Sequence, residues 1–383
     1  MSFTRRGALQ AGAGLVALAA VGRAEKLYAR AALPETMIWS TYDVGSSGYV
    51  ESSAIADAFG KKFGSRIRLQ PSGTAIGRVK PLIDRRVDYG WLANEVFFAS
   101  EGIYEYCTPD LGPQGLRTLA GRRNSISVAV TATSGIRSIA DLKGKRFAIA
   151  RANSSVNVKM DAFLAFGQLE WEDLELVEFP GYGATMKALI EGRADATMAA
   201  PASPALRELE ASSYGIGWIE LPADDQDGWA RAQRVLPFVE PYQETIGPGL
   251  SEGKPAWMIG YRHPMLTTNA DSSVDQAYAM LKGVAETYEL YKAATPIMTR
   301  WDIRKAGTPP MDAPLHDGAI RYLTEIGQWT AAQQAWQDNA IRRQVALQEA
   351  WRSFMGTPEA KSADADRLQA LWGERRMKTI DGL

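Results

Sequence analysis

The apolar and polar positions between residues 66 and 88 predict a strand, a polar loop and an amphipathic helix, in that order. Ile67 and Leu69 lie two apart among polar residues, which is the spacing of one face of a strand. Ser72 or Thr74 can then cap a helix. Apolar residues at helical spacing follow: Ile76, Val79 and Ile83. Such a loop presents free N–H groups and the positive end of a helix dipole, which favours an anion, although an ordinary capped junction has the same pattern.

The same pattern occurs a second time, later in the chain. Segments 80–95 and 187–202 share six of sixteen residues, and each predicts a helix end, a turn and a strand that opens with Asp88 or Asp195. A second matched pair lies upstream, where 39–42 leads into 43–48 and 147–150 leads into 151–155. Two α/β halves facing each other would place several helix N-termini around one cleft. Convergence on a common β–α–β pattern would give the same similarity.

Period-two and period-3.6 patterns predict the remaining elements. Strands are expected at 66–70, 88–93, 116–120, 125–130, 146–150, 176–179, 216–221 and 257–261. Helices are expected at 51–63, 155–166, 184–191, 273–292, 318–327 and 328–354. The stretch from Pro237 to Pro255 is rich in proline and is expected to form loops, where the chain would return to its first half.

Composition and charge narrow the possible functions. A chain of 383 residues suits two domains, and a net charge of −1 disfavours nucleic acid or a membrane surface as the main partner. The single cysteine, Cys107, excludes an internal disulfide and a cysteine zinc site, and we expect it to be buried. Two histidines, His263 and His316, leave little room for metal or triad chemistry.

The N-terminus has the features of an export signal. Arg5 and Arg6 precede a mild apolar run at 8–21, which is shorter than the roughly 20 residues that a membrane-spanning helix needs. Residues 29–31 read Ala-Arg-Ala, an A-x-A cleavage site. Residues 1–31 are therefore expected to be a signal peptide, either of the twin-arginine type or a general secretory signal with two arginines by chance.

Several motifs occur together in one order. Gly48-Tyr49 is followed by Pro71-Ser-Gly-Thr, then by the helix end 85–88, the segment 134–146 and the segment 184–199. Residues 314–327 read Pro-Leu-His-Asp-Gly-Ala-Ile-Arg-Tyr-Leu-Thr-Glu-Ile-Gly. With these motifs the chain resembles, from about 37 to 327, the TAXI family of solute receptors, the substrate-binding subunits of tripartite ATP-independent periplasmic (TRAP) transporters.

The resemblance implies a two-lobed periplasmic binding fold (type II-like) that closes on a small solute and passes it to the transporter's membrane subunits. Two departures from the family pattern bear on the ligand and on docking. Gly77 stands where many members have asparagine, and Arg78 follows with a charge in the first turns of the helix. The tail after Gly327 lies outside the family core, and it either adds a docking surface or braces the first lobe.

Two lobes and a tail are expected after the signal peptide. The first lobe is predicted at 34–121 plus 237–327, the second at 125–234, and a helical C-terminal extension at 328–383. Four polar loops, each opening a helix, predict the site between the lobes. The expected ligand-binding residues are Tyr42, Ser46, Ser47, Tyr49, Ser72, Gly73, Thr74, Arg78, Ser154, Ser155 and Tyr182.

The expected ligand is a small carboxylate, either a dicarboxylate or an amino acid. Arg78 can grip a carboxylate through two parallel hydrogen bonds, although it can also face solvent or pair with Glu95. No cofactor, metal site or catalytic residue is predicted, and His316 is expected to cap the helix at 318–327. The alternatives are a receptor for an ATP-driven importer or a sensor, and an exported enzyme. The enzyme alternative lacks a Gly-x-Ser-x-Gly motif and a histidine pair at helical spacing.

Overall fold

Parallel strands form one end of the sheet in a computed structural model that describes residues 33–42, 46–72, 74–151, 153–203 and 205–383. The strands are β1 (Thr36–Tyr42), β2 (Arg66–Ser72) and β3 (Tyr89–Leu92), with β1 in the middle. Helices α2 (Ser47–Phe63), α3 (Ala75–Ile83) and α4 (Glu95–Glu101) each follow one of these strands. The predicted signal peptide and Gly73 lie outside the described residues.

A second parallel set lies at the other end of the sheet. Here β5 (Arg146–Ile149) pairs with both β6 (Glu175–Glu178) and β7 (Ala196–Ala199). The helices of this half are α5 (Ser154–Gly167), α6 (Tyr182–Ile190), α7 (Ala205–Ala211) and α8 (Gln226–Val235). The acidic cluster 224–227 forms a turn that leads into α8, where the side chain of Asp225 caps the helix by accepting a hydrogen bond from the N–H of Gly228 at 2.8 Å.

Two long antiparallel strands connect these sets. They are β4 (Leu116–Thr131) and β10 (Ala256–Asn269), and the strand order is β2-β1-β3-β10-β4-β7-β5-β6. Two short strands lie off this path: β8 (Ile216–Trp218) pairs with β4, and β9 (Glu240–Glu244) pairs with β10. The prediction of separate strands at 116–120 and 125–130 is wrong, because the polar residues between them pair with β10 through Arg123, Asn124 and Ser125.

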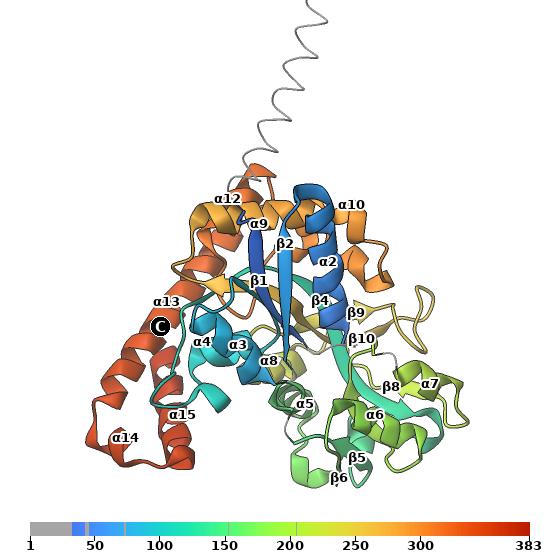
Figure 1. Cartoon of the computed structure of the whole chain (residues 1–383). Helices are drawn as coiled ribbons and strands as arrows, with labels where there is room; N and C mark the ends of the chain where they lie inside the picture. Colours follow the sequence, from blue (N-terminus) through green and yellow to red (C-terminus); the bar gives the residue numbers. More distant parts are fainter. Residues whose placement is uncertain (1–32, 43–45, 73, 152, 204) are drawn as a thin grey trace, which may run out of the picture.

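The predicted long helix at 273–292 is divided in two. α9 (Val274–Glu286) ends before Thr287, whose hydroxyl donates to the carbonyl of Gly283 at 2.7 Å, and α10 (Tyr288–Tyr291) begins after it. α11 (Ile303–Ala306) and α12 (Asp317–Glu325) follow. α9 and α12 lie together near β1 and β2, at the top of Figure 1.

The chain ends in three helices that lie against the first half. They are α13 (Ala331–Met355), α14 (Pro358–Ser362) and α15 (Ala365–Asp381), drawn in red at the left of Figure 1. Thr330 and Gln333 form a capping box that starts α13. The rings of Trp351 and Trp372 join α13 to α15, with their centroids 4.9 Å apart. The predicted helical extension is confirmed, although α14 and α15 were not foreseen.

Separate hydrophobic clusters support the two halves. Trp39, Phe59 and Trp91 are fully buried in the cluster beneath α2 and α9. Ala148, Met186 and Leu206 belong to another cluster around α6 and α7. The predicted class, two α/β lobes with a helical C-terminal extension, is confirmed. The exact lobe boundaries stay a prediction, because one path of hydrogen-bonded strands runs through both sets. Within the described ranges no helix has the length and apolar character to cross a membrane.

Candidate functional site

Each of the four predicted polar loops opens a helix. Ser46 caps α2 by accepting from the N–H of Tyr49 at 3.1 Å, and Thr74 caps α3 by accepting from Gly77 at 3.2 Å. The other two loops lead into α5 at Ser154 and α6 at Tyr182. These residues do not all converge, because several of them only complete their own helix ends.

A buried group of residues forms where α5 of the second half meets the first half. Ser155 Oγ lies 3.4 Å from Asn94 Oδ1, and Ser154 Oγ lies 2.9 Å from Glu105 Oε1. We call the residues gathered here the inter-lobe cluster: Tyr42, Arg78, Asn94, Glu95, Asn124, Ser155, Lys159, Tyr261, His263 and Asp312.

Arg78 occupies one side of the cluster and already has an anionic partner. Its Nε donates to Glu95 Oε1 at 2.8 Å, and its guanidinium stacks on the ring of Tyr42 at 3.9 Å from the centroid. The hydroxyl of Tyr42 donates to the same carboxylate oxygen at 3.1 Å. Burial opposes ionisation of Glu95, but the attraction of Arg78 outweighs it and lowers the pKa of Glu95. Pairing with Glu95 was the alternative that the sequence left open for Arg78.

Lys159 is a second cation in the cluster, and the sequence analysis did not identify it. It is only 2% exposed, and its Nζ donates to the carbonyl of Ser155 at 2.6 Å and to the Ser155 hydroxyl at 3.2 Å. The Nζ also lies 4.5 Å from the centroid of the Tyr261 ring. It forms no ion pair with any carboxylate that the structure describes. Burial lowers the pKa of Lys159 to about 8, while the more distant carboxylates of Asp312 and Glu95 oppose that shift.

Asp312 and Asn94 lie next to Lys159. Asn94 Nδ2 donates to Asp312 Oδ2 at 2.8 Å, whereas Asp312 Oδ1 is buried with no partner among the described atoms. Burial raises the pKa of Asp312 to about 7. This carboxyl is therefore protonated in a large fraction of molecules at neutral pH, which leaves the cluster with a positive charge.

Tyr261 and His263 complete the cluster from β10. The Tyr261 hydroxyl accepts from Asn124 Nδ2 at 2.9 Å. The His263 ring lies edge-on to Tyr42, with centroids 5.1 Å apart. Burial, together with nearby Arg122, Lys159 and Arg78, holds the pKa of His263 well below its usual value, so the imidazole is neutral. Its Nδ1 is buried and has no partner among the described atoms.

The structure thus brings together only part of the predicted set. Tyr42, Arg78 and Ser155 lie in the inter-lobe cluster. Tyr182 lies close enough to Tyr261 to add to the effect of burial in raising the pKa of Tyr261. The Tyr182 hydroxyl bonds the Ser203 hydroxyl at 3.1 Å and accepts from the N–H of Ala200 at 2.9 Å. The remaining described candidates lie at helix starts, except Ser72, which ends β2: Ser46, Ser47, Tyr49, Thr74 and Ser154. Whether they bind a ligand stays a prediction.

One sequence signal could have revealed Lys159. It follows Ser155 by four residues, so both project from one face of α5, and that face begins at a polar loop. The cavity lined by Tyr182, Asn153 and Asn157 holds only about 10 Å³, which admits no more than one water. Among the described residues, no group of three or more metal-binding side chains is placed to hold an ion.

Comparisons with known proteins identify relatives. The sequence profile of the NMT1-like family matches residues 44–327. No curated protein sequence matches the chain. The aliphatic sulphonate binding protein SsuA of Escherichia coli is similar at 16% identity, over 80% of this chain and 85% of that one, with a TM-score of 0.45.

Two other solved structures show similar likeness. A protein of Bordetella bronchiseptica RB50 is 16% identical over 89% of this chain and 98% of its own, with a TM-score of 0.44. R. palustris Rpa4515, solved with adipate, is 13% identical over 70% of this chain and 95% of its own, also at 0.44. These likenesses are too distant to support an inference about the ligand of this chain.

Proposed function

The chain belongs to the NMT1-like family, and from that premise we propose that it is a periplasmic solute receptor of the TAXI type. It captures a small organic anion, a carboxylate or an amino acid, between its lobes and delivers it to the membrane subunits of a TRAP transporter. The family match and the charge of the inter-lobe cluster support this proposal.

The observation that carries the proposal is Lys159. A buried ammonium group is costly unless an anion pairs with it or other acceptors satisfy its donors. Buried Arg262 in this region is satisfied by four bonds to backbone carbonyls, whereas two other buried cations have carboxylate partners. Arg78 pairs with Glu95, and Arg122 binds Glu51 through two bonds of 2.6 and 2.7 Å. Lys159 has only a carbonyl and a hydroxyl as hydrogen-bond partners among the described residues. A ligand carboxylate would supply the missing anion.

The neighbours of Lys159 suit a small polar solute. Tyr42 and Tyr261 supply aromatic walls, and the neutral His263 leaves one ring nitrogen without a partner. The N-terminus of α5 adds backbone N–H groups and the positive end of its dipole beside Ser155. Because Glu95 neutralises its charge, Arg78 would mainly hold the Tyr42 ring in place. It would not be the main group that binds the ligand carboxylate.

Access requires the halves to separate. The cluster is filled by its own side chains, and the nearby cavity at Tyr182 holds about 10 Å³. The contacts from Ser154 to Glu105 and from Ser155 to Asn94 would break when the lobes open. The long strands β4 and β10 pass from one half to the other, and they would bend when the lobes open.

Delivery to a TRAP transporter rests on the resemblance of segments 48–88, 134–199 and 314–327 to the TAXI family. A gene for a TRAP membrane subunit beside this one would support it. A neighbouring ATP-driven importer would instead favour the other kind of receptor.

Calorimetry on Lys159 variants tests the ligand proposal, after a thermal-shift screen of organic acids and amino acids has found a ligand. Lys159→Met should weaken binding about 10- to 100-fold, because a hydrogen bond to a charged group is worth roughly 1.5–3 kcal/mol. The matched control is Lys187→Met on the exposed face of α6, which should bind like the parent. If Lys159→Met binds within twofold of the parent, or if only uncharged solutes bind, the proposal is wrong. Mass spectrometry should recover the ligand unchanged.

A further inference from the structure

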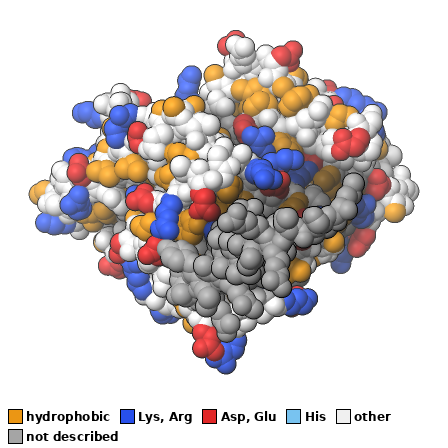
Figure 2. All heavy atoms as spheres, turned by 90° about the horizontal axis from the view of Figure 1, so that it is seen from above, with side chains coloured by type: hydrophobic (Ala, Val, Ile, Leu, Met, Phe, Trp, Pro, Cys, Tyr) orange, Lys and Arg blue, Asp and Glu red, His pale blue; other side chains and the backbone are white. Residues whose placement is uncertain are grey.

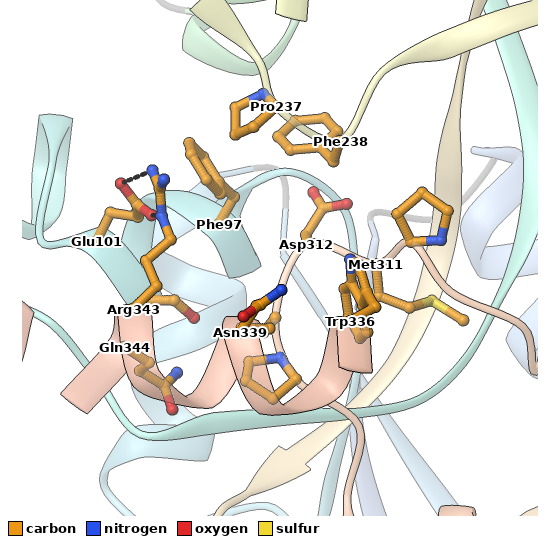
Figure 3. A pocket seen from close by; sticks show the side chains of 15 residues that line it. Phe97, Glu101, Pro237, Phe238, Met311, Asp312, Trp336, Asn339, Arg343 and Gln344 are labelled. Carbon is orange, nitrogen blue, oxygen red and sulfur yellow. Dashed lines mark hydrogen bonds and ion pairs between the residues drawn. The ribbon is translucent and has the colours of Figure 1, made fainter. Parts of the chain in front are cut away.

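A larger cavity lies where the C-terminal extension meets the first half, and Lys159 is not among the residues that line it. It has a volume of about 210 Å³ and opens between α13, α4 and the segment around Phe238. Its walls are mainly apolar, with Phe97, Phe238 and Trp336 as the aromatic members. Figure 3 shows these side chains around a central carboxylate, that of Asp312. We call this space the extension cavity.

Asp312 gives the extension cavity a defined chemistry. Its Oδ2 is occupied by Asn94, whereas Oδ1 is buried and lacks a partner among the described atoms. The carboxylate is directed toward Pro237 and Phe238 in the close-up view (Figure 3). A buried acceptor without a donor is costly, so a donor brought by a ligand would stabilise this arrangement.

The other charged groups of the cavity are already paired. Arg343 donates from Nε to Glu101 Oε1 at 2.6 Å and from Nη2 to Glu101 Oε2 at 3.0 Å, and Arg376 binds the same carboxylate. Figure 3 shows this pair to one side of the cavity, away from Asp312. Asp312 is therefore the acceptor that remains available, and the aromatic rings beside it favour a cation over an anion.

We propose that the extension cavity is a second ligand site, which binds a small apolar primary amine. The ammonium group donates to Asp312 Oδ1, and the apolar part lies against Phe97, Phe238 and Trp336. A cavity of this volume matches about seven waters of liquid, so the ligand is smaller than a typical drug. The extension cavity shares Asp312 with the inter-lobe cluster, but Lys159, Arg78 and Tyr42 do not line it.

Benzylamine is a suitable probe, because it is cationic at neutral pH and combines one ring with one primary ammonium group. Benzyl alcohol, of nearly the same shape but uncharged, is its control. Isothermal calorimetry on the mature protein should show saturable binding of benzylamine, and benzyl alcohol should bind at least tenfold more weakly. Asp312→Asn should weaken benzylamine binding at least tenfold.

Two substitutions on α13 separate this site from a general effect on the helix. Ala340 lines the cavity, so Ala340→Phe should fill it and abolish binding. Val345 is 43% exposed on the same helix, so Val345→Phe should leave binding within twofold of the parent. The Ala340 and Val345 pair keeps the test valid even if Asp312→Asn fails to fold.

Lys159→Met separates this inference from the proposed function. It should weaken anion binding about 10- to 100-fold, whereas benzylamine should still bind saturably, because the lost lysine charge does not attract a cationic ligand. The inference is overturned if benzylamine does not saturate, if benzyl alcohol binds equally well, or if Ala340→Phe binds like the parent. Loss of benzylamine binding in Lys159→Met would place the amine in the inter-lobe cluster and would also overturn the inference.

Discussion

Buried charges near the middle of the molecule differ in how well they are neutralised. Glu51 binds Arg122 and also accepts from the indole N–H of Trp301 at 2.8 Å. Glu244 binds Arg300, the Ser125 hydroxyl and two backbone N–H groups. Such saturated pairs hold strands and helices in place. Lys159 lacks this saturation, which agrees with the proposal that it binds a ligand anion.

Replacing Lys159 by methionine should therefore stabilise the unliganded protein. Burial lowers the pKa of Lys159 to about 8, below the value of about 10.4 in an unfolded chain. The folded state then binds fewer protons than the unfolded state between these values, so the charged lysine costs stability below pH 8. The difference between the two pKa values corresponds to a loss of roughly 3 kcal/mol in the free energy of unfolding at pH 7. The gain from Lys159→Met is smaller than this, because the variant also loses the two hydrogen bonds of the lysine.

Urea unfolding at pH 7 and pH 10 measures this effect. Lys159→Met should be more stable than the parent at pH 7. The gap should narrow by pH 10, where the folded-state lysine is neutral and the unfolded-state lysine has begun to lose its proton. A variant that is less stable than the parent at pH 7 would show that Lys159 contributes to folding.

Residues in the inter-lobe cluster were only partly predictable. Tyr42, Arg78 and Ser155 lie in or beside polar loops at strand–helix junctions, and such loops are visible in the sequence. Lys159 and Asp312 are buried beside Asn94 by contacts between segments more than 60 residues apart, for which a single sequence has no local signal. His316 was predictable, because its Nδ1 accepts from the N–H of Gly318 at 3.1 Å as an ordinary helix cap.

At the scale of elements, the sequence predicted what local patterns determine. β2 and α3 appear where the alternating and helical spacings place them, and Thr74 is the cap. The long strand β4 was predicted as two pieces, since its polar centre is satisfied only by pairing with β10. Tertiary pairing, which the local pattern does not contain, determines its true length.

The helix α13 is fixed to the first half by polar contacts that can be tested singly. Gln337 is 1% exposed, and its side chain makes two hydrogen bonds of 2.8 Å to the backbone N–H and carbonyl of Leu315. Gln337→Ala leaves the N–H and the carbonyl of Leu315 without a partner. It should lower the free energy of unfolding by about 2–4 kcal/mol. Gln334→Ala, on the exposed side of the same helix, should cost less than about 0.5 kcal/mol.

Urea unfolding of the two variants compares these costs. Equal stability of Gln337→Ala and the parent would mean that α13 is not needed to brace the first lobe. The extension would then serve another purpose, such as docking.

At the scale of the whole molecule, charge does not indicate one large partner of opposite sign. The net charge is −1, and Figure 2 shows acidic and basic side chains interspersed with hydrophobic ones over the described part of one face. This distribution agrees with the proposed receptor for a small solute and does not favour a partner that is a polyanion. The two halves and the strands β4 and β10 that join them then become the functional unit.

Ligand binding should close and stabilise this unit. Polar contacts from Ser154 to Glu105 and from Ser155 to Asn94 join the halves beside a hydrophobic cluster that both halves share, and we expect the polar contacts to open in the unliganded protein. At a concentration 100-fold above its dissociation constant, a ligand adds about 2.7 kcal/mol to the free energy of unfolding. This raises the melting temperature of a chain of this size by about 4 °C.

Small-angle X-ray scattering should show a smaller radius of gyration with the ligand than without it. In Lys159→Met, where binding is weakened about 10- to 100-fold, the same ligand concentration should add only about 0.4–1.4 kcal/mol and should reduce the radius of gyration less. If the parent is stabilised and its radius of gyration stays constant, the ligand binds without closure, and the role assigned to β4 and β10 is wrong.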